Sequence, residues 1–296
     1  MNHLADEKLL RLQNAELKIL CELRDYCKKK SLTYYLAFGT LLGAVRHQGF
    51  IPWDDDIDVF MPREDYQRFL VEAENDLPDW LSIRTYKNSK LGENNFAVQA
   101  KVEAKSIYVV RSLGKNNVKH RIWVDVFILD GMPKTSIVRD IHYYSIQALF
   151  WKCWIAKTKI GTKKELPRPL YKKIGLAIIE RMHINNYIDL IETYDEMTRT
   201  FMKYDYERSD YVIGYAHAYG HNCIVPRWCF GQGQPILFEG EIFNAPADPD
   251  TLLKSWYGDY MTLPPEEQRI AKHCVDIIMD DSDETSVQVQ TAEKHF

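Results

Sequence analysis

Residues 34–61, YYLAFGTLLGAVRHQGFIPWDDDIDVFM, decide how this chain folds. The first residues read as a short aromatic and aliphatic strand that breaks at Gly39-Thr40, and an apolar helix of about two turns follows and ends near Gly49. Glycine lets a backbone approach a ligand closely, and the Thr40 hydroxyl can donate to a phosphate at the start of that helix. The stretch therefore predicts a small-residue turn able to hold a phosphate.

The end of the same stretch predicts a strand over residues 56–61 that carries two acids. Side chains two apart on a strand share a face, so Asp56 and Asp58 are expected side by side, with Asp55 on the opposite face. Two such carboxylates repel each other unless a cation compensates them, and Mg²⁺ or Mn²⁺ is the usual oxygen-ligated partner. An acidic loop on an edge strand is the plain alternative. The Gly39-Thr40 turn upstream favours a metal-assisted phosphoryl-transfer site instead.

The run from residue 34 to residue 63 resembles the signature of the LicD family of phosphotransferases, relatives of fukutin and fukutin-related protein in the nucleotidyltransferase-fold superfamily. Two further pieces resemble the family: residues 123–131, WVDVFILDG, and residues 257–265, which hold YGDYM and LPP. The resemblance implies an α+β fold, in which helices flank a nucleotidyltransferase-like mixed β-sheet and a helical insertion interrupts the chain.

The resemblance also implies an activity. A phospho-alcohol group, most plainly phosphocholine, would pass from a CDP-activated donor to a sugar hydroxyl of a teichoic acid, capsule or lipooligosaccharide precursor, and CMP would leave. Asp56 and Asp58 would hold Mg²⁺ or Mn²⁺. Asp125, a lone acid in an apolar strand, would complete the metal site or accept the proton of the attacking hydroxyl.

Two other functions remain open from the sequence. One is a nucleotidyltransferase that uses an NTP and releases pyrophosphate. The other is a non-catalytic module that binds carbohydrate or a membrane surface, although the intact acids argue against it.

Further residues are candidates for binding substrate. Arg46 and His47 can contact phosphate or orient Asp54. Three aromatic residues can stack on cytosine or contact a trimethylammonium group: Trp53, Tyr34 and Tyr35. The alternative is that they pack in the core. Lys101 can point toward the catalytic surface of the sheet, although a solvated edge lysine is the commoner explanation. In the family a terminal element closes over the active site, and it would bring Tyr257 and Asp259.

Composition narrows the class of protein. The chain has 296 residues, 46% of them hydrophobic, and a formal net charge of −4, which gives no general attraction to nucleic acid. The sequence shows neither a signal peptide nor a stretch apolar enough to span a membrane, and six cysteines without framework spacing suit a reducing compartment. A cytoplasmic protein is therefore expected.

The chain is expected to divide into a catalytic core over 1–133, a helical aromatic and basic segment over 134–210, a part over 211–280 that completes the catalytic domain, and a disordered tail over 281–296. Within the second part, residues 143–173 can lie at a membrane interface, or can be a packed helix with solvated lysines. Asp130 is expected as a turn or cap residue. Periodicity predicts helices over 4–30, 63–75, 170–182, 187–204 and 248–256, strands over 81–86, 96–102, 106–110 and 122–129, and a hairpin over 236–243.

Overall fold

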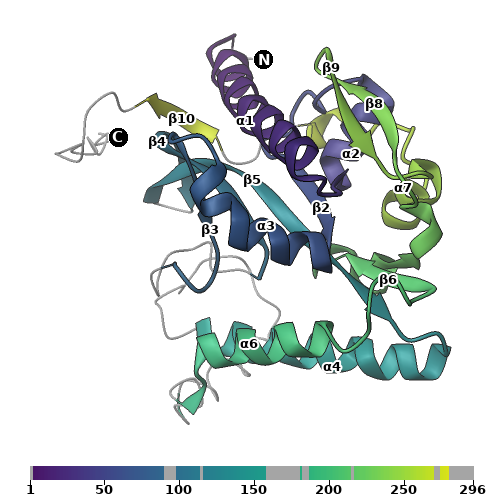
Figure 1. Ribbon diagram of the computed structural model, residues 1–296. Helices are drawn as coiled ribbons and strands as arrows, with labels where there is room; N and C mark the ends of the chain where they lie inside the picture. The colour runs from purple at the N-terminus through teal and green to yellow at the C-terminus, as the bar shows by residue number, and fades with distance from the viewer. Residues whose placement is uncertain are drawn as a thin grey trace.

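The computed structural model describes residues 3–89, 98–113, 116–157, 181, 187–214, 217–269 and 274–279. In this part of the chain eight strands form one mixed sheet with the central order β1-β2-β5-β4-β10 (Figure 1). The strands are β1 (Tyr35–Leu36), β2 (Asp58–Pro62), β3 (Leu81–Arg84), β4 (Ala100–Leu113), β5 (Asn116–Met132), β6 (Tyr211–Gly214), β7 (Ile224–Pro226) and β10 (Cys274–Met279). Strand β3 pairs with β4, and β6 joins β5 to β7.

The described helices lie around this sheet. They are α1 (His3–Lys30), α2 (Phe38–His47), α3 (Arg63–Asp76), α4 (Ser136–Lys157), α6 (Leu190–Phe201) and α7 (Pro249–Tyr257). Short 3-10 turns occupy His217–Cys223, Arg227–Cys229 and Glu266–Gln268. The arrangement confirms the predicted α+β class.

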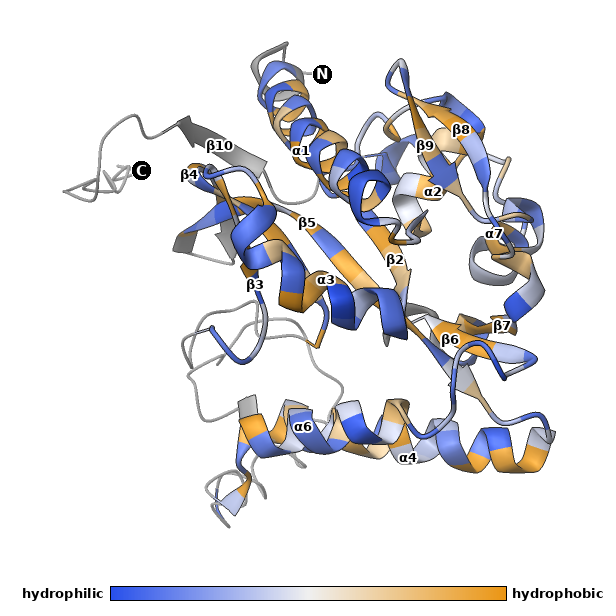
Figure 2. Cartoon of the chain, in the orientation of Figure 1, coloured by the Kyte–Doolittle hydropathy of each residue, from blue (hydrophilic) through white to orange (hydrophobic). Residues whose placement is uncertain are grey.

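Strand β5 is the centre of the sheet because it pairs with three strands: β2 in parallel, β4 and β6 antiparallel. Its side chains alternate, and Ile122, Val124 and Val126 are fully buried on one face. Helices α1 and α3 pack against the sheet, and both show hydrophobic and hydrophilic sides (Figures 1 and 2). The other face of β5 carries Trp123 and Asp125 and is the face on which the candidate site lies.

An aromatic cluster covers part of that second face. The ring of Phe38, at the start of α2, lies 4.8 Å from Phe60, 5.4 Å from Phe127 and 4.9 Å from Trp256 of α7, measured between ring centroids. Phe38 has φ 41°, a left-handed conformation that costs a bulky residue about 1–2 kcal/mol. Ring packing offsets this cost and fixes the direction in which α2 leaves the sheet.

The hairpin of β8 (Gln234–Phe238) and β9 (Glu241–Ala245) confirms the prediction of a turn at Gly240. Both turn residues, Glu239 and Gly240, have positive φ, as the type I′ hairpin turn requires. The Glu239 carboxylate also accepts a 2.9 Å hydrogen bond from the Phe50 N–H. The hairpin therefore fixes the loop that leads from α2 to the acids.

The position of Asp130 differs from the prediction that it is a turn or cap residue. It lies within β5, is 2% exposed and accepts two hydrogen bonds from Arg63, at 2.7 Å from Nε and 2.6 Å from Nη2. It is a buried ion-pair partner that joins the start of α3 to the sheet, and the prediction of a turn or cap residue is wrong.

Several predicted boundaries also change. The strands predicted over 96–102 and 106–110 form one strand, β4, with an irregularity between Glu103 and Tyr108. The strand predicted from Asp56 begins at Asp58. The helix predicted over 187–204 is α6, three residues shorter at each end, and α7 lies within a residue of its prediction. The predicted helix over 170–182 is outside the described residues, apart from Arg181, and so is the tail over 281–296.

The aromatic and basic segment is described only as far as α4. Tyr143 is buried, whereas Trp151 and Trp154 are 55% and 39% exposed, with their rings 5.7 Å apart. Residues 158–173 lie outside the described residues, so a membrane contact there stays a prediction. Among the helices that the structure describes, none is both long and apolar enough to cross a bilayer.

Candidate active site

Three charged residues stand in register on three neighbouring strands. Asp58, the first residue of β2, pairs with Asp125 of β5, and Asp125 pairs with Lys101 of β4. Directly paired residues of a sheet project to the same face, so the three side chains form one line, the charged row. The prediction that Asp125 lies on a strand adjoining the first acids is confirmed.

The loop before β2 brings further acids to the charged row. Asp56 and Asp58 are partly exposed, as is Asp54, whereas Asp55 and Ile57 between them are buried. This alternation agrees with the prediction that Asp55 turns away from the other acids. Because the strand starts only at Asp58, the loop rather than a strand register places Asp56.

The electrostatics of the row centre on Asp58. Burial, and then the charges of Asp56, Asp125 and Asp54, raise the pKa of Asp58 well above its ordinary value, while Lys101 lowers it. The negative charges are therefore close enough to act on one another. A carboxyl group under this repulsion favours either a proton or a bound cation.

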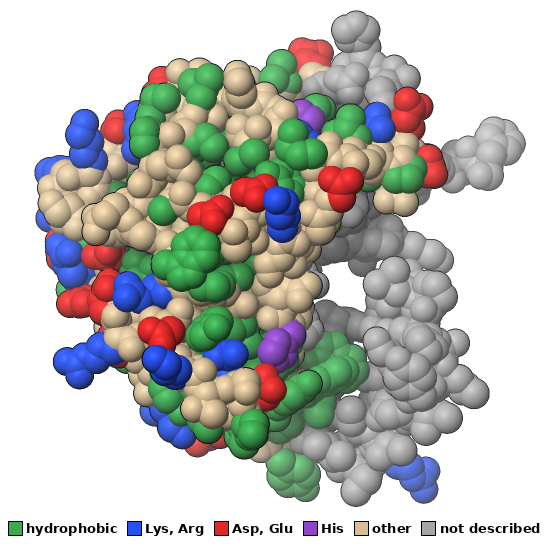
Figure 3. All heavy atoms as spheres, turned by 90° about the vertical axis from the view of Figure 1, so that its right-hand side faces the viewer, with side chains coloured by type: hydrophobic (Ala, Val, Ile, Leu, Met, Phe, Trp, Pro, Cys, Tyr) green, Lys and Arg blue, Asp and Glu red, His purple; other side chains and the backbone are tan. Residues whose placement is uncertain are grey.

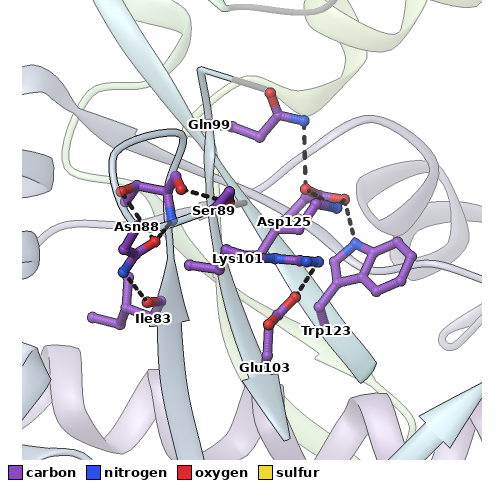
Figure 4. A network of polar contacts seen from close by, with 10 residues as sticks. Ile83, Asn88, Ser89, Gln99, Lys101, Glu103, Trp123 and Asp125 are labelled. Carbon is purple, nitrogen blue, oxygen red and sulfur yellow. Dashed lines mark hydrogen bonds and ion pairs between the residues drawn. The ribbon is translucent and has the colours of Figure 1, made fainter. Parts of the chain in front are cut away.

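Asp125 is held in a fixed orientation (Figure 4). Lys101 Nζ lies 2.8 Å from its Oδ1 and 3.0 Å from its Oδ2, and the Trp123 indole N–H donates to Oδ2 at 2.7 Å. Gln99 Nε2 lies 3.5 Å from Oδ1. The Lys101 side chain is 7% exposed, so the expectation of a solvated edge lysine is wrong.

The Gly39-Thr40 turn lies directly under the acids, in the first turn of α2. Thr40 is buried, and its Oγ1 accepts a 2.9 Å hydrogen bond from the Asp58 N–H. A Cβ at Gly39 would lie 2.6 Å from an Asp54 carboxylate oxygen, so only glycine allows Asp54 to approach the backbone this closely. The turn thus positions Asp58 and Asp54, in addition to its predicted role toward phosphate.

Arg46 and His47 tie α2 to the C-terminal segment. Arg46 Nη1 donates to the Tyr260 carbonyl at 2.6 Å, and its Nε donates to His47 Nε2 at 3.0 Å. Burial, followed by the charge of Arg46, lowers the pKa of His47. Tyr257 is close enough to act on the charge of Arg46, so the predicted terminal element lies beside α2. Asp259 is exposed and accepts a 2.6 Å hydrogen bond from Thr262.

The three aromatic candidates differ in burial. Tyr34 and Tyr35 are 6% and 2% exposed; Asn244 N–H donates to the Tyr34 hydroxyl, and the Tyr35 hydroxyl donates to the Gly231 carbonyl. Both are core residues, the alternative that the sequence left open. Trp53 is partly exposed, with the Arg269 guanidinium 5.9 Å from its ring centroid, and it alone of the three is placed to meet a ligand.

Sequence reasoning missed Trp123 and Gln99 as parts of the site. Trp123 stands two residues before Asp125 on a strand, so the shared face of the two side chains was available as a signal. The role of Gln99 follows only from the pairing of β4 with β5 and had no sequence signal.

The donors present fit a divalent cation by chemistry, although the side chains do not enclose one as they lie. Among the described residues, no three acid, histidine or cysteine side chains converge at metal-binding distance. The mutual repulsion around Asp58 is nevertheless what a cation relieves. Asp125 can take part as well, because a carboxylate offers about four acceptor positions and its partners do not use all of them.

The surface beside the site carries no strong charge of one sign. On the side that includes α7 and the β8–β9 hairpin, the described acidic and basic side chains are mixed, with hydrophobic ones between them (Figure 3). That face offers no extended basic track for nucleic acid.

The sequence is similar to a known protein family and to several known proteins. Residues 31–172 match the family model described as LicD/FKTN/FKRP, nucleotidyltransferase domain. Over 265 residues, 87% of this chain and 92% of the relative, the sequence is 29% identical to the lipopolysaccharide cholinephosphotransferase LicD of Haemophilus influenzae. An uncharacterized protein of Rickettsia typhi is 39% identical over 72 residues, 22% of this chain and 23% of the relative. Another, from Rickettsia prowazekii, is 44% identical over 48 residues, 16% and 18% of the two chains.

Proposed function

We propose that the chain is a transferase that moves phosphocholine from a CDP-activated donor to a sugar hydroxyl, because residues 31–172 match the family model described as LicD/FKTN/FKRP, nucleotidyltransferase domain. The acceptor is a lipopolysaccharide-type glycan. Similarity along most of the chain to the Haemophilus cholinephosphotransferase supports the transferred group and the acceptor class. CMP is the product that leaves.

The observation that carries this proposal is the charged row together with the loop acids. Asp58 and Asp125 face each other across parallel strands, and Asp56 and Asp54 add charge at the same end of the sheet. Such a concentration of carboxylates beside a phosphate-binding turn suits Mg²⁺ or Mn²⁺, with Asp56, Asp58 and Asp125 as the ligands. When bound, the ion would neutralise the donor diphosphate and the charge that develops on CMP.

Other residues accept the proton, bind the donor phosphate and stack on the donor. Asp125, oriented by Lys101 and Trp123, accepts the proton of the attacking sugar hydroxyl if it is not occupied as a ligand. The backbone at Gly39 and the Thr40 hydroxyl hold a donor phosphate, since both lie at the N-terminus of α2. Trp53 provides a ring for cytosine or for the choline head.

Residues that link α2 to the C-terminal segment fix the rim of the site. Arg46 and His47 act there with Tyr257, while Asp259 offers an exposed carboxylate to the acceptor. These roles concern substrate positioning rather than bond breaking.

The purified chain is tested with a lipopolysaccharide-type glycan as acceptor and a panel of donors, namely CDP-choline, CDP-ribitol, CDP-glycerol and the four NTPs, in Mg²⁺ or Mn²⁺. CMP is expected from CDP-choline at a higher rate than from the other CDP-alcohols. Pyrophosphate release from an NTP in place of CMP release would replace the proposal with the nucleotidyltransferase alternative. Absence of any turnover across the panel would leave only a binding function.

Divalent metal is expected to raise the melting temperature in a saturable way, because an ion that binds only the native state stabilises it by mass action. Differential scanning fluorimetry with increasing Mn²⁺ measures the shift. Asp56→Asn is expected to remove the shift.

Asp55→Asn is the matched control, since Asp55 neighbours Asp56 in sequence but is buried away from it. Its metal-dependent shift is expected to equal that of the parent, whatever its own melting temperature. If Asp55→Asn and Asp56→Asn lose the metal-dependent shift equally, the inference that Asp55 and Asp56 point to opposite sides of the loop is incorrect.

A further inference from the structure

Four neighbouring side chains at the edge of the site, three of them basic, form what we call the basic rim. Arg46 Nε donates to His47 Nε2 at 3.0 Å, and the centroids of the His47 and Trp53 rings are 6.4 Å apart. The Arg269 guanidinium lies 5.9 Å from the centroid of the same tryptophan ring. All four side chains are partly exposed, so a ligand from solution can reach them.

Both arginines of the basic rim are anchored on one short stretch of backbone. Arg46 Nη1 donates to the Tyr260 carbonyl at 2.6 Å, and Arg269 Nε donates to the Pro264 carbonyl at 2.7 Å. These carbonyls lie in the segment that follows α7, and α7 packs against α2, the helix that carries Arg46 (Figure 1). The C-terminal segment therefore holds the two guanidiniums at the same edge of the site.

In the part of the chain that the structure describes, neither of these arginines forms an ion pair with an acid. Their hydrogen bonds go to backbone carbonyls and to His47. Burial lowers the pKa of Arg46, because its charge is partly removed from water. By contrast Arg227, also 5.9 Å from a ring centroid, is ion-paired with Glu207. A guanidinium without such an acid offers its remaining N–H donors to an anionic ligand, and phosphate matches its planar fork.

The basic rim adjoins the turn to which we assign a donor phosphate. Trp53 directly precedes Asp54, and a Cβ at Gly39 would lie 2.6 Å from a carboxylate oxygen of Asp54. Neighbouring Cα atoms are about 3.8 Å apart, so Trp53 begins close to the Gly39-Thr40 turn. A ligand that uses both places needs a planar ring for the tryptophan and phosphates for the arginines and the turn. A nucleoside diphosphate has both.

The charge of the basic rim disfavours choline at Trp53. A tryptophan ring can bind a trimethylammonium group by a cation–π contact, but the Arg269 guanidinium already lies beside this ring. A quaternary ammonium there would add a second positive charge close to the first, and like charges brought together at a binding site oppose binding. The aromatic ring is therefore better suited to an uncharged base than to the choline head.

We propose that the basic rim binds the cytidylyl half of the donor: Trp53 stacks on cytosine, and Arg46 and Arg269 bind the phosphate that leaves with CMP. This deepens the proposed function and rests on it, since it assumes a CDP-activated donor. It adds Arg269 to the residues that bind substrate. It also directs the choline end of the donor away from the rim.

Binding of CMP to the full chain, measured by isothermal titration calorimetry in EDTA, tests the proposal without turnover. EDTA removes divalent ions, so the measured affinity does not depend on a metal site. The parent is expected to bind CMP more tightly than it binds cytidine or inorganic phosphate. Choline is expected not to displace CMP.

Two variants separate the phosphate contact from the base contact. Arg269→Gln is expected to weaken CMP binding about tenfold and to leave cytidine binding unchanged, because it removes a charge-assisted contact with phosphate. Trp53→Leu is expected to weaken the binding of CMP and of cytidine alike, each about tenfold, because it removes stacking on the base.

Arg227→Gln is the matched control, since Arg227 lies at the same distance from an aromatic ring but already has Glu207 as a partner. Its affinity for CMP is expected to equal that of the parent. Circular dichroism in the near ultraviolet identifies any variant that is not folded. If Arg269→Gln does not fold, Arg46→Gln, for which the same loss of CMP affinity is expected, decides.

The outcomes separate this proposal from the proposed function. The proposal is overturned if the parent does not bind CMP, if folded Arg269→Gln binds CMP as the parent does, if choline displaces CMP, or if inorganic phosphate binds as tightly as CMP. CMP release by the parent from CDP-choline, with Mg²⁺ and the acceptor glycan, leaves the proposed function intact in each case. No CMP release from any CDP-alcohol, together with no CMP binding, would overturn both.

Discussion

Asp58→Asn is expected to lower CMP release from CDP-choline by about 10³-fold, since loss of roughly 4 kcal/mol of transition-state stabilisation corresponds to that factor. Asp58 is the acid on which the charges of Asp56, Asp125 and Asp54 converge. The amide keeps the shape of the side chain but removes the charge that would hold the ion. Initial rates at saturating donor, acceptor glycan and Mg²⁺ measure the loss. A variant that keeps a tenth of the parent rate would remove Asp58 from the catalytic site.

The same variant is expected to be more stable than the parent when metal is absent. Burial and the neighbouring acids raise the folded-state pKa of Asp58 above its unfolded value of 3.8, so ionised Asp58 opposes folding. This destabilisation is absent below the unfolded pKa and grows as the pH rises toward the folded pKa. The gain of Asp58→Asn should therefore be small near pH 4 and larger at neutral pH. Melting temperatures in EDTA across this range check it, and a gain that is largest at low pH would contradict the sign.

Asp130→Ala is expected to destabilise the fold by about 3–5 kcal/mol, because it leaves the guanidinium of Arg63 buried without its partner. Arg63 donates both hydrogen bonds to Asp130, at 2.7 and 2.6 Å, and the side chains of Arg63 and Asp130 are 12% and 2% exposed. Chemical denaturation measures the change in free energy of unfolding.

The double variant Arg63→Met, Asp130→Leu separates the pair from its packing. It is expected to be more stable than either single variant, since apolar residues of similar size replace a buried ion pair with little loss. If Asp130→Ala costs less than about 0.5 kcal/mol, as surface substitutions usually do, the residue is a turn residue after all.

Local pattern predicted the parts of the site that are close in sequence. The turn at Gly39, the helix after it and the alternation around Asp56 all follow from residues within one stretch, and the structure retains them. The lone acid in the apolar run of β5 indicated Asp125 because an unpaired charge in such a strand is unfavourable. Only the family resemblance placed that strand beside β2.

Contacts distant in sequence had no comparable signal. Lys101 is buried because β4 lies inside the sheet, between β5 and its other partners β3 and β10, and a strand's place in a sheet depends on pairings that local periodicity does not encode. Asp130 reads as a turn residue beside Gly131 because its partner Arg63 is 67 residues away. The left-handed Phe38 is held by rings from three other elements, and its own sequence neighbourhood favours an ordinary strand end.

Phosphorus-31 NMR of the parent chain with CDP-choline, Mg²⁺ and a lipopolysaccharide-type glycan tests the central claim most directly. Cleavage between the two phosphates, with transfer of phosphocholine, predicts that a CMP resonance and a sugar phosphodiester resonance grow in equal amounts as the two diphosphate resonances disappear. Asp58→Asn under the same conditions is expected to leave the diphosphate unchanged. CDP-choline left intact in this sample, while a parallel sample with an NTP in place of CDP-choline shows a growing pyrophosphate resonance, would contradict the account.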